Sequence, residues 1–600
     1  MNKYEDLINI LDTLCREAPE SYSRYHPNND SGKLLQARSR AYIHLFLKVK
    51  FGLMTFLERE NYVTDDPGDA GVDAYFIDKE SRKLYFIQSK FRNTTNNFEN
   101  KEITLEELLA MDVERIMEGE DKNEQGDYYN NKIKNLIAQL QAITDLPRYS
   151  IKVIILANVN PKLNKSKLNR ITCGYDVEVY NNERVYSELV FPLISGTYYD
   201  IKELKITINI DRDNSNRRIE YDPMTRYGGC TVTALFVPTI EIAKILSKYK
   251  NSILKYNPRS YLDLAAGSVN EKIAKSITDI NTNEFALFNN GITLLSDETV
   301  YSDKVGKKNK AEIIITNPQI INGGQTAYTL SVLYERFNNE ELREKFQNKD
   351  VLLKIISLCE DDENSSICPN QDKLKLIEEI SIATNQQNEV SEADRRANDK
   401  VQIELQELIY RDFGLFYERK RGEFGDGIRN KYIDRKKIID REHFMRVCLA
   451  SNKEPVKAFS GSTKAFFEKT NFDKILPDSS QYRKYVYLYM LFQKLKKAKY
   501  KDCPNIHLYA KFSIIMVVSD QFLETLNLSE YEDSIDRKIE DIKQIWPQFE
   551  QYALNSKPNK DLYFKDIIDK STGEKRVILN WPSYYKGKTI ITDLITYFKL

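Results

Sequence analysis

The sequence is poor in the residues that build zinc sites, disulfide frameworks and histidine-based active sites. Its 600 residues include seven cysteines and four histidines. The cysteines are scattered and no two form a CxxC pair, which predicts reduced, buried thiols and no zinc. Because the whole chain has so few histidines, catalysis that depends on histidine has few candidates.

The chain also lacks an excess of one charge and a long apolar run. Lysine and arginine together number 89, as do aspartate and glutamate, so a nucleic-acid site must come from a local cluster of basic residues. No run of about 18 apolar residues occurs, which predicts no membrane span and no membrane partner. The first residues carry acids and no uninterrupted apolar core, so we expect no signal peptide and a cytoplasmic location.

The apolar residues that are present suffice for several packed cores. They make up 41% of the chain, and a chain of this length is expected to form about two to four domains. Residues 1–198 have the pattern of an α/β domain, residues 199–437 that of an α+β domain, and residues 438–600 are mostly helical. These three ranges are the predicted domains.

Hydrophobic periodicity predicts individual elements in the first and third ranges. The predicted strands cover 74–78, 84–91 and 150–159, and the predicted helices cover 34–53, 104–119, 130–143, 483–500 and 507–526. A continuous apolar strand such as 150–159, following helices, is typical of a sheet that is covered on both faces.

Two polar side chains interrupt an apolar strand in the first range. In LYFIQSKF, residues 84–91, side chains alternate between faces, so Gln88 and Lys90 share a face with Leu84 and Phe86. Polar groups are costly there unless they have partners. They either contact a ligand or reach solvent at the end of a hairpin, and the pattern leaves both readings open.

A run of acids upstream offers such a ligand site. Asp65, Asp69 and Asp73 recur every four residues in a stretch with glycine and proline that leads into a strand. Mg²⁺ prefers carboxylate oxygens and keeps several waters, so Asp73 could anchor Mg²⁺ or Mn²⁺, and Lys90 could hold the attacking water and stabilise charge on a phosphate. The predicted catalytic residues are Asp73, Gln88 and Lys90, and the predicted metal ligands are Asp69, Asp73, Gln88 and Ser89.

A second candidate site lies in the middle range. In IINGGQTAYTL a strand ends at Asn322-Gly323-Gly324 and a helix begins near Gln325. The N–H groups of that helix could bind an anion, with Asn322, Gln325 and Thr326 adding directional hydrogen bonds. An ordinary tight turn explains the same residues.

Two further stretches are candidates for nucleic-acid or nucleotide binding. Asn385 and Gln386 belong to an amide-rich stretch before Ser391, whose spacing to Asp394 predicts a capping box. Residues 417–437 cluster basic side chains among aromatic ones, which suits phosphate contacts and base stacking, although a solvated loop would look similar. The basic candidates are Arg419, Lys420 and Arg421.

The sequence resembles two known protein families. Asp73, Gln88 and Lys90, with the order helix, strand, strand, helix, strand across 34–158, resemble the PD-(D/E)xK nucleases in the variant with Gln as the second acid. That resemblance implies a restriction-endonuclease-like fold for the N-terminal domain. The motifs NEFALFNNGITLL, NPQIINGGQTAYTL, IATNQQNEVSEADRRAND and GLFYERKRGE, in that order, resemble the abortive-infection phage-resistance family, AIPR, over roughly residues 40–460.

These resemblances imply a phage-defence protein that acts as a Mg²⁺-dependent endonuclease on nucleic acid, with DNA favoured over RNA. A phage-derived trigger is an expected partner, and homo-oligomers are left open. The alternative is an inactive nuclease fold that senses nucleic acid or a nucleotide signal. This alternative rests on a missing acid. PD-(D/E)xK nucleases often carry a glutamate on the first helix of their core, whereas residues 34–50 of the corresponding predicted helix contain no glutamate. Glu58 is the nearest acid downstream.

Overall fold

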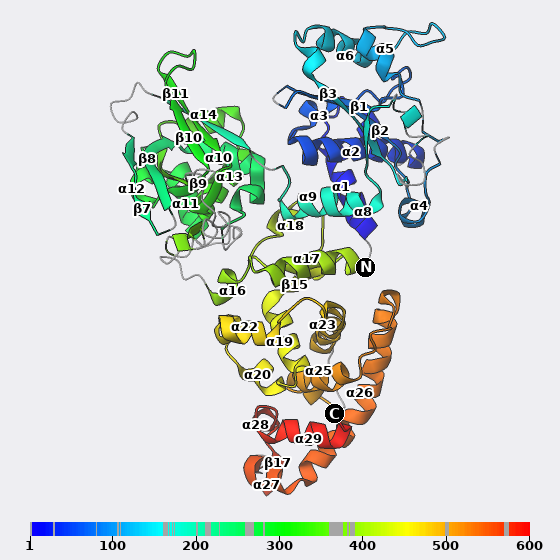
Figure 1. Cartoon of the computed structure of the whole chain (residues 1–600). Coiled ribbons are helices and arrows are strands. Elements are labelled where there is room, and N and C mark those ends of the chain that lie inside the picture. Colours follow the sequence, from blue (N-terminus) through cyan, green and yellow to red (C-terminus); the bar gives the residue numbers. More distant parts are fainter. Residues whose placement is uncertain are drawn as a thin grey trace.

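The computed structural model divides into three parts, which Figure 1 shows as an N-terminal part in blue and cyan, a middle part in green, and a helical part in yellow to red. It describes the following residues: 3–27, 30–79, 81–104, 107–108, 110–159, 166, 169–170, 172, 174–199, 202–209, 218–226, 228–257, 269–279, 282–358, 376–377, 379–380, 383, 391–497, 503–568 and 575–600.

The N-terminal part is built on a four-stranded sheet in the order β1-β2-β3-β4. β1 and β2 form an antiparallel hairpin, and β2, β3 and β4 run parallel. The strands are β1 (Ala74–Asp78), β2 (Lys83–Ser89), β3 (Ser150–Leu156) and β4 (Asp176–Val179). The helices are α1 (Lys3–Arg16), α2 (Ser31–Phe51), α3 (Phe56–Glu60), α4 (Thr95–Glu99), α5 (Val113–Glu118), α6 (Asn131–Gln141), α8 (Asn182–Val185) and α9 (Phe191–Ser195).

Helices cover both faces of this sheet. Ile87 and Ile154 pack into a core with α1 and α2, whereas Phe86 and Val153 pack into a second core with α5 and α6. Neighbouring residues of one strand therefore enter opposite cores, as the period-two alternation requires. The predicted covered sheet and the order helix, strand, strand, helix, strand across 34–158 are confirmed. That this sheet belongs to the PD-(D/E)xK nucleases stays a prediction.

The single continuous helix predicted over 104–119 is wrong, because residues 110–112 are not helical. The apolar spacing of 104–119 predicts a single helix, but α5 begins only at Val113. Before it, the chain forms tertiary hydrogen bonds instead: Ile103 N–H donates to Asn158 C=O, and Asp112 N–H donates to Ala70 C=O. These contacts hold the segment against the end of β3 and against the loop that precedes β1.

The middle part combines two sheets with helices. One sheet has the order β10-β11-β5, and the other has the order β12-β9-β13-β8-β6 with β7 paired to β8. The strands are β5 (Glu203–Asn209), β6 (Ile219–Tyr221), β7 (Met224–Thr225), β8 (Gly228–Pro238), β9 (Ile292–Ser296), β10 (Glu298–Ser302), β11 (Lys310–Thr316), β12 (Gln319–Asn322) and β13 (Asp350–Leu358). The helices are α10 (Thr239–Tyr249), α11 (Val269–Thr278), α12 (Phe285–Phe288), α13 (Gly324–Arg336) and α14 (Asn339–Phe346).

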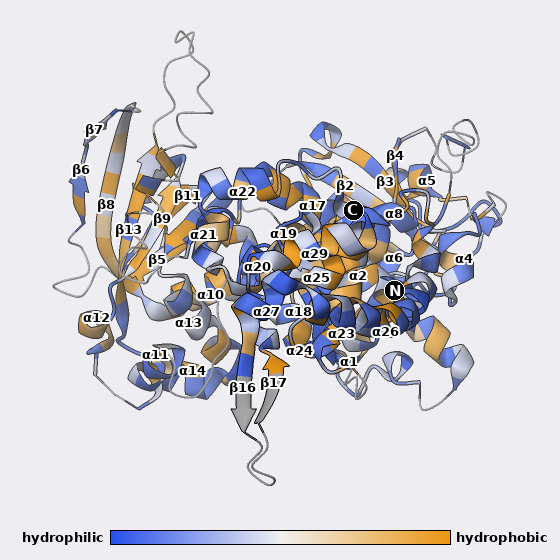
Figure 2. Ribbon diagram, turned by 90° about the horizontal axis from the view of Figure 1, so that it is seen from below, coloured by the Kyte–Doolittle hydropathy of each residue, from blue (hydrophilic) through white to orange (hydrophobic). Residues whose placement is uncertain are grey.

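The remainder, from residue 392 onward, is mostly helical, and the prediction of a mostly helical region over 438–600 is confirmed. Its most buried helix is α25 (Lys511–Asp520), in which every residue from Phe512 to Ser519 is buried. Figure 2 shows this helix as hydrophobic among the central helices, as expected for a helix packed on all sides. The other helices are α16 (Glu392–Arg395), α17 (Lys400–Phe413), α18 (Gly425–Arg429), α19 (Arg441–Ser451), α20 (Pro455–Ser460), α21 (Thr463–Phe467), α22 (Lys469–Ile475), α23 (Tyr482–Lys497), α24 (Asn505–Leu508), α26 (Tyr531–Asn555), α27 (Lys557–Tyr563), α28 (Trp581–Tyr584) and α29 (Thr589–Phe598).

Two short sheets accompany these helices. β14 (Phe416–Glu418) pairs in parallel with β15 (Ile438–Asp440), and β16 (Phe564–Ile568) pairs antiparallel with β17 (Lys575–Leu579). Within the described part of the chain, no helix combines the length and apolarity needed to cross a membrane.

Residues 402–441, which we call the joining segment, contact all three parts. Tyr417 packs in the core of the C-terminal helices, and the adjacent Phe416 packs in the core around α1 and α2. Lys420 donates to the backbone carbonyl of Leu254 in the middle part at 3.1 Å. The joining segment therefore contributes residues to two hydrophobic cores. The predicted boundary between residues 437 and 438 stays a prediction.

Candidate metal centre

The loop before β1 curls sharply because three of its residues have left-handed backbone angles. Gly68, Ala70 and Gly71 have φ values of 82°, 59° and 72°. A Cβ added at Gly71 would lie 2.4 Å from the Ala110 carbonyl oxygen, so the position admits no side chain without movement of the backbone. This curl places Asp69 close to Asp73.

Backbone hydrogen bonds close the two ends of this loop. The Thr64 and Asp65 N–H groups both donate to the Asp73 carbonyl, at 2.9 and 3.2 Å. The Val72 N–H donates to the Asp69 carbonyl at 2.9 Å. The loop is therefore anchored at the base of β1, and Asp65 is held beside the strand that Asp73 precedes.

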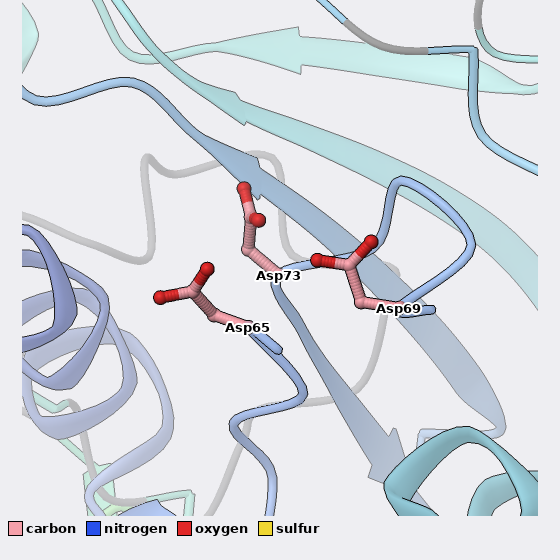
Figure 3. A group of neighbouring side chains, drawn as sticks. All are labelled: Asp65, Asp69 and Asp73. Carbon is pink, nitrogen blue, oxygen red and sulfur yellow. The ribbon is translucent and has the colours of Figure 1, made fainter. Parts of the chain in front are cut away.

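These bonds bring three carboxylates together. One oxygen from each of Asp65, Asp69 and Asp73 lies within 4.8 Å of the others, and Figure 3 shows the three side chains as neighbours at the start of β1. Asp73 is only 8% exposed, while Asp65 and Asp69 are half-buried. Two carboxylate charges at such a separation repel by about 3 kcal/mol at an effective dielectric constant of 20.

Burial and mutual repulsion perturb the acidity of this group. Burial, followed by the charges of Asp65 and Asp69, raises the pKa of Asp73 from 3.8 to about 7. Burial also raises the pKa of Asp69 to about 6, with Asp65 adding to the shift. A group of acids whose ionised form is disfavoured in this way is a candidate functional site, because a cation would remove the penalty.

The end of β2 lies next to this group. Ser89 N–H donates to Asp73 Oδ2 at 2.6 Å and orients the carboxylate. Gln88 is buried, and its Nε2 donates to the Gly71 carbonyl at 2.7 Å, which fixes the loop. The Lys90 charge acts on both Asp73 and Asp69, lowering the pKa of each.

Gln88, from the polar face predicted for the strand, therefore contacts the acidic loop. Lys90 follows the last residue of β2 and acts on the loop through its charge. Structure and prediction agree that Asp69, Asp73, Gln88, Ser89 and Lys90 are neighbours. The contacts made by Gln88 and Ser89 are different from the predicted ones: here an amide and a backbone N–H position the acidic loop. Their predicted role as metal ligands stays a prediction.

Asp65 and Arg40, which were not among the predicted site residues, complete this region. Asp65 belongs to the recurrence of acids, but only its backbone contacts bring it beside Asp73. Arg40, buried on α2, lies 3.4 Å from Asp65 Oδ2 and 3.2 Å from Asp66 Oδ1. α2, the helix in which the glutamate of such nucleases was sought, thus presents an arginine to the loop. Glu58 caps α3 through Thr55, with bonds of 2.8 and 2.9 Å to its N–H and Oγ1.

The second candidate site forms the predicted turn between strand and helix. β12 ends at Asn322, Gly323 has a φ of 81°, and α13 begins at Gly324 without a side-chain cap. A Cβ at Gly323 would lie 2.7 Å from the Gly291 carbonyl oxygen, so this glycine permits close approach of two backbones. Thr326 is buried and accepts a bond from Asn289 at 3.0 Å, while Gln325 is half-buried. Anion binding at this turn stays a prediction.

Of the amide-rich stretch and the capping box after it, the structure describes the capping box, from residue 391 onward. Asn385 and Gln386 lie outside the described residues. Ser391 and Asp394 form the predicted capping box at the start of α16.

Of the three basic candidates, Arg419 and Lys420 form internal contacts. Arg419 bonds to Gln406 at 2.9 Å and forms an ion pair with Glu423 at 3.1 Å. Lys420 is buried, its ammonium donates to backbone carbonyls, and burial lowers its pKa to about 7. Arg421 is exposed. Of the three predicted contacts, Arg421 alone extends to the surface.

Comparison with known proteins gives one match. The family model described as AIPR protein matches residues 254–561. The match extends further toward the C-terminus than the motifs indicated and does not include the N-terminal sheet. Searches of curated proteins and of solved structures gave no match.

Proposed function

The chain belongs to the AIPR family, which implies a role in abortive-infection phage defence, and we propose that in this role it acts as a metal-dependent nuclease, with DNA as the favoured substrate. The observation that carries the proposal is the convergence of Asp65, Asp69 and Asp73 beside Lys90 at the start of a buried sheet. The N-terminal sheet, outside the matched range, would be the catalytic module.

The residues present fit a divalent cation. Three carboxylates offer the hard oxygen ligands that Mg²⁺ and Mn²⁺ prefer. Ser89 Oγ, which is next to the N–H that binds Asp73, is buried without a hydrogen-bond partner among the described residues. When bound, such an ion polarises a phosphate and lowers the pKa of water.

The side chains around the cation would bind it, position the loop and stabilise charge on the phosphate. Asp73, oriented by the Ser89 N–H, would hold the cation together with Asp65 and Asp69. Gln88 would keep the loop against β2 through its bond to Gly71. Lys90 would hold a phosphate oxygen or the attacking water and stabilise the negative charge that develops.

One contact favours a second candidate function. Arg40 binds Asp65 from α2, so an internal cation already neutralises part of the acidic loop. If this ion pair persists, the module would bind nucleic acid or a signal without cleaving it. The two candidates differ in whether the chain cleaves nucleic acid when a divalent cation is present.

The test is cleavage of supercoiled plasmid and single-stranded RNA by the full chain with Mg²⁺, Mn²⁺ or EDTA. We expect cleavage with Mg²⁺ or Mn²⁺, with DNA cut faster than RNA, and none with EDTA. Asp73→Asn should reduce the activity to the EDTA level. Glu114→Gln removes an exposed carboxylate from α5 and should cleave like the unmodified protein. Failure of the unmodified protein to cleave either substrate would support the binding function instead.

A further inference from the structure

A cavity of about 700 Å³ lies between α16, the joining segment, α19 and α21. Its size falls within the range of small-molecule sites, roughly 300–1,000 Å³. Its lining is strongly polar and consists of Ser391, Glu392, Ala393, Asp394, Arg395, Glu418, Arg421, Asp440, Arg441, Glu442, Thr463 and Lys464. We call it the joining-segment cavity.

The cavity lies where two parallel strands end. β14 and β15 pair in parallel, with Glu418 opposite Asp440, and both residues line the cavity. α19 begins at the next residue, Arg441. In open α/β arrangements, ligands bind in the crevice outside the carboxyl ends of the strands. The local topology is therefore one that commonly provides a binding site.

The floor of the cavity is held by an internal ion pair. Arg441, only 6% exposed, pairs with the buried Asp394 and donates to the Arg419 and Ala393 carbonyls, at 2.6 and 3.2 Å. These bonds join α16, the joining segment and α19. Their charges and donors are satisfied, so the floor is pre-formed.

Groups of both signs remain available around this floor. Arg421 and Lys464 are exposed, and among the described residues neither forms an ion pair or hydrogen bond with a side chain. Glu418 accepts one bond, from Gly422 N–H at 3.0 Å, and burial raises its pKa to about 6. Glu442 is exposed, and within the described ranges its one hydrogen bond is a long 3.5 Å bond from Thr463.

We propose that the joining-segment cavity binds a nucleotide, with its phosphates on Arg421 and Lys464 and its ribose hydroxyls on Glu418 and Glu442. Arginine and lysine are the usual phosphate partners, and a carboxylate that accepts from ribose hydroxyls is a recurrent feature of nucleotide sites. A phosphate alone would use only the basic groups and little of the volume. The two signs of charge thus fit a ligand with an anionic end and a hydroxyl-bearing end.

The stretch of the joining segment that lines the cavity also packs against the N-terminal part. Glu418 and Arg421 lie between Phe416 and Phe424 in the joining segment. The rings of these two phenylalanines lie 6.2 and 6.1 Å from the ring of Phe191, which packs against the N-terminal core. A nucleotide bound by Glu418 and Arg421 would therefore contact the same short stretch that packs against the proposed catalytic module. That the nucleotide regulates cleavage rests on the proposed function; that it binds does not.

The test is calorimetric titration of the full chain with ATP, GTP, adenosine and inorganic phosphate. We expect at least one of ATP and GTP to bind, and adenosine and phosphate to bind at least about tenfold more weakly. Arg421→Ala and Lys464→Ala should each weaken nucleotide binding by about tenfold or more. Lys436→Ala removes an exposed cation of the joining segment outside the cavity and should bind like the unmodified protein.

Three results would overturn the proposal: no binding of either nucleotide, equal loss of affinity in Lys436→Ala, or phosphate binding as tightly as the nucleotide. Asp73→Asn separates this proposal from the nuclease. It should bind nucleotide with unchanged affinity while cleaving nothing. Nucleotide binding by a protein that never cleaves nucleic acid would support the cavity and refute only the nuclease.

Discussion

Replacing Asp73 with asparagine should make the metal-free protein more stable at neutral pH. Burial and the charges of Asp65 and Asp69 raise the pKa of Asp73 from 3.8 to about 7. The folded state therefore binds this proton more tightly than the unfolded state. The contribution of this bound proton to the free energy of unfolding is fully present in acid, and it is lost as the pH rises from about 4 to about 7.

The size of the stability gain in Asp73→Asn follows from the shift in the pKa of Asp73. About three pKa units correspond to about 4 kcal/mol at 1.36 kcal/mol per unit. The full gain of Asp73→Asn is expected above pH 7, where the carboxylate is charged in both states. At pH 5 the folded wild type is already protonated, and the gain falls to about 2 kcal/mol. The asparagine carbonyl can still accept from the Ser89 N–H.

Scanning calorimetry of both proteins at pH 5, 6, 7 and 8 in EDTA measures this gain. Added Mg²⁺ should raise the melting temperature of the wild type and leave Asp73→Asn unchanged, because ligand binding to the folded state stabilises it. Glu114→Gln serves as the control and should show neither effect. A variant less stable than the wild type at pH 8 in EDTA would refute the reasoning and make Asp73 a structural residue.

Variants at three other positions test the site and the second candidate turn. Lys90→Ala should lower cleavage about 100- to 1,000-fold without weakening Mg²⁺ binding, and Lys90→Arg should not restore it; full activity in either would exclude this lysine from the reaction. Gly71→Ala should lose Mg²⁺ stabilisation and cleavage, because its Cβ would lie 2.4 Å from the Ala110 carbonyl oxygen; unchanged Mg²⁺ affinity would show that the loop does not shape the site. Gly324→Val should stay folded, since the nearest atom to a Cβ at this position would be Asn257 Nδ2, 3.3 Å away, and should weaken DNA binding in fluorescence anisotropy; wild-type affinity would reduce this turn to a structural one.

The sheet of the N-terminal part could be predicted because it depends on local alternation. Residues 74–78 were predicted as a strand and form β1, and Gln88 was correctly placed on the face of Phe86. The prediction of one continuous helix over 104–119 was wrong, because hydrogen bonds from Asp112 to Ala70 and from Ile103 to Asn158 override local periodicity before α5 begins at Val113.

The candidate site was predictable only in part, for the same reason. The recurrence of acids was visible, but the placement of Asp65 depends on left-handed residues and on bonds to the Asp73 carbonyl. Arg40 gave no signal, because an arginine on a helix is ordinarily solvated. Lys420 looked like a phosphate contact, yet its partner, the Leu254 carbonyl, is distant in sequence. Contacts of this kind cannot be predicted from spacing.

The most direct test of the central claim is to locate the cation. Crystals of the full chain soaked in Mn²⁺ give an anomalous signal at the metal position. The account predicts a peak coordinated by Asp65, Asp69 and Asp73, and loss of that peak in Asp73→Asn. A Mn²⁺-soaked crystal with no peak among these carboxylates, and with Arg40 still paired to Asp65, would contradict it.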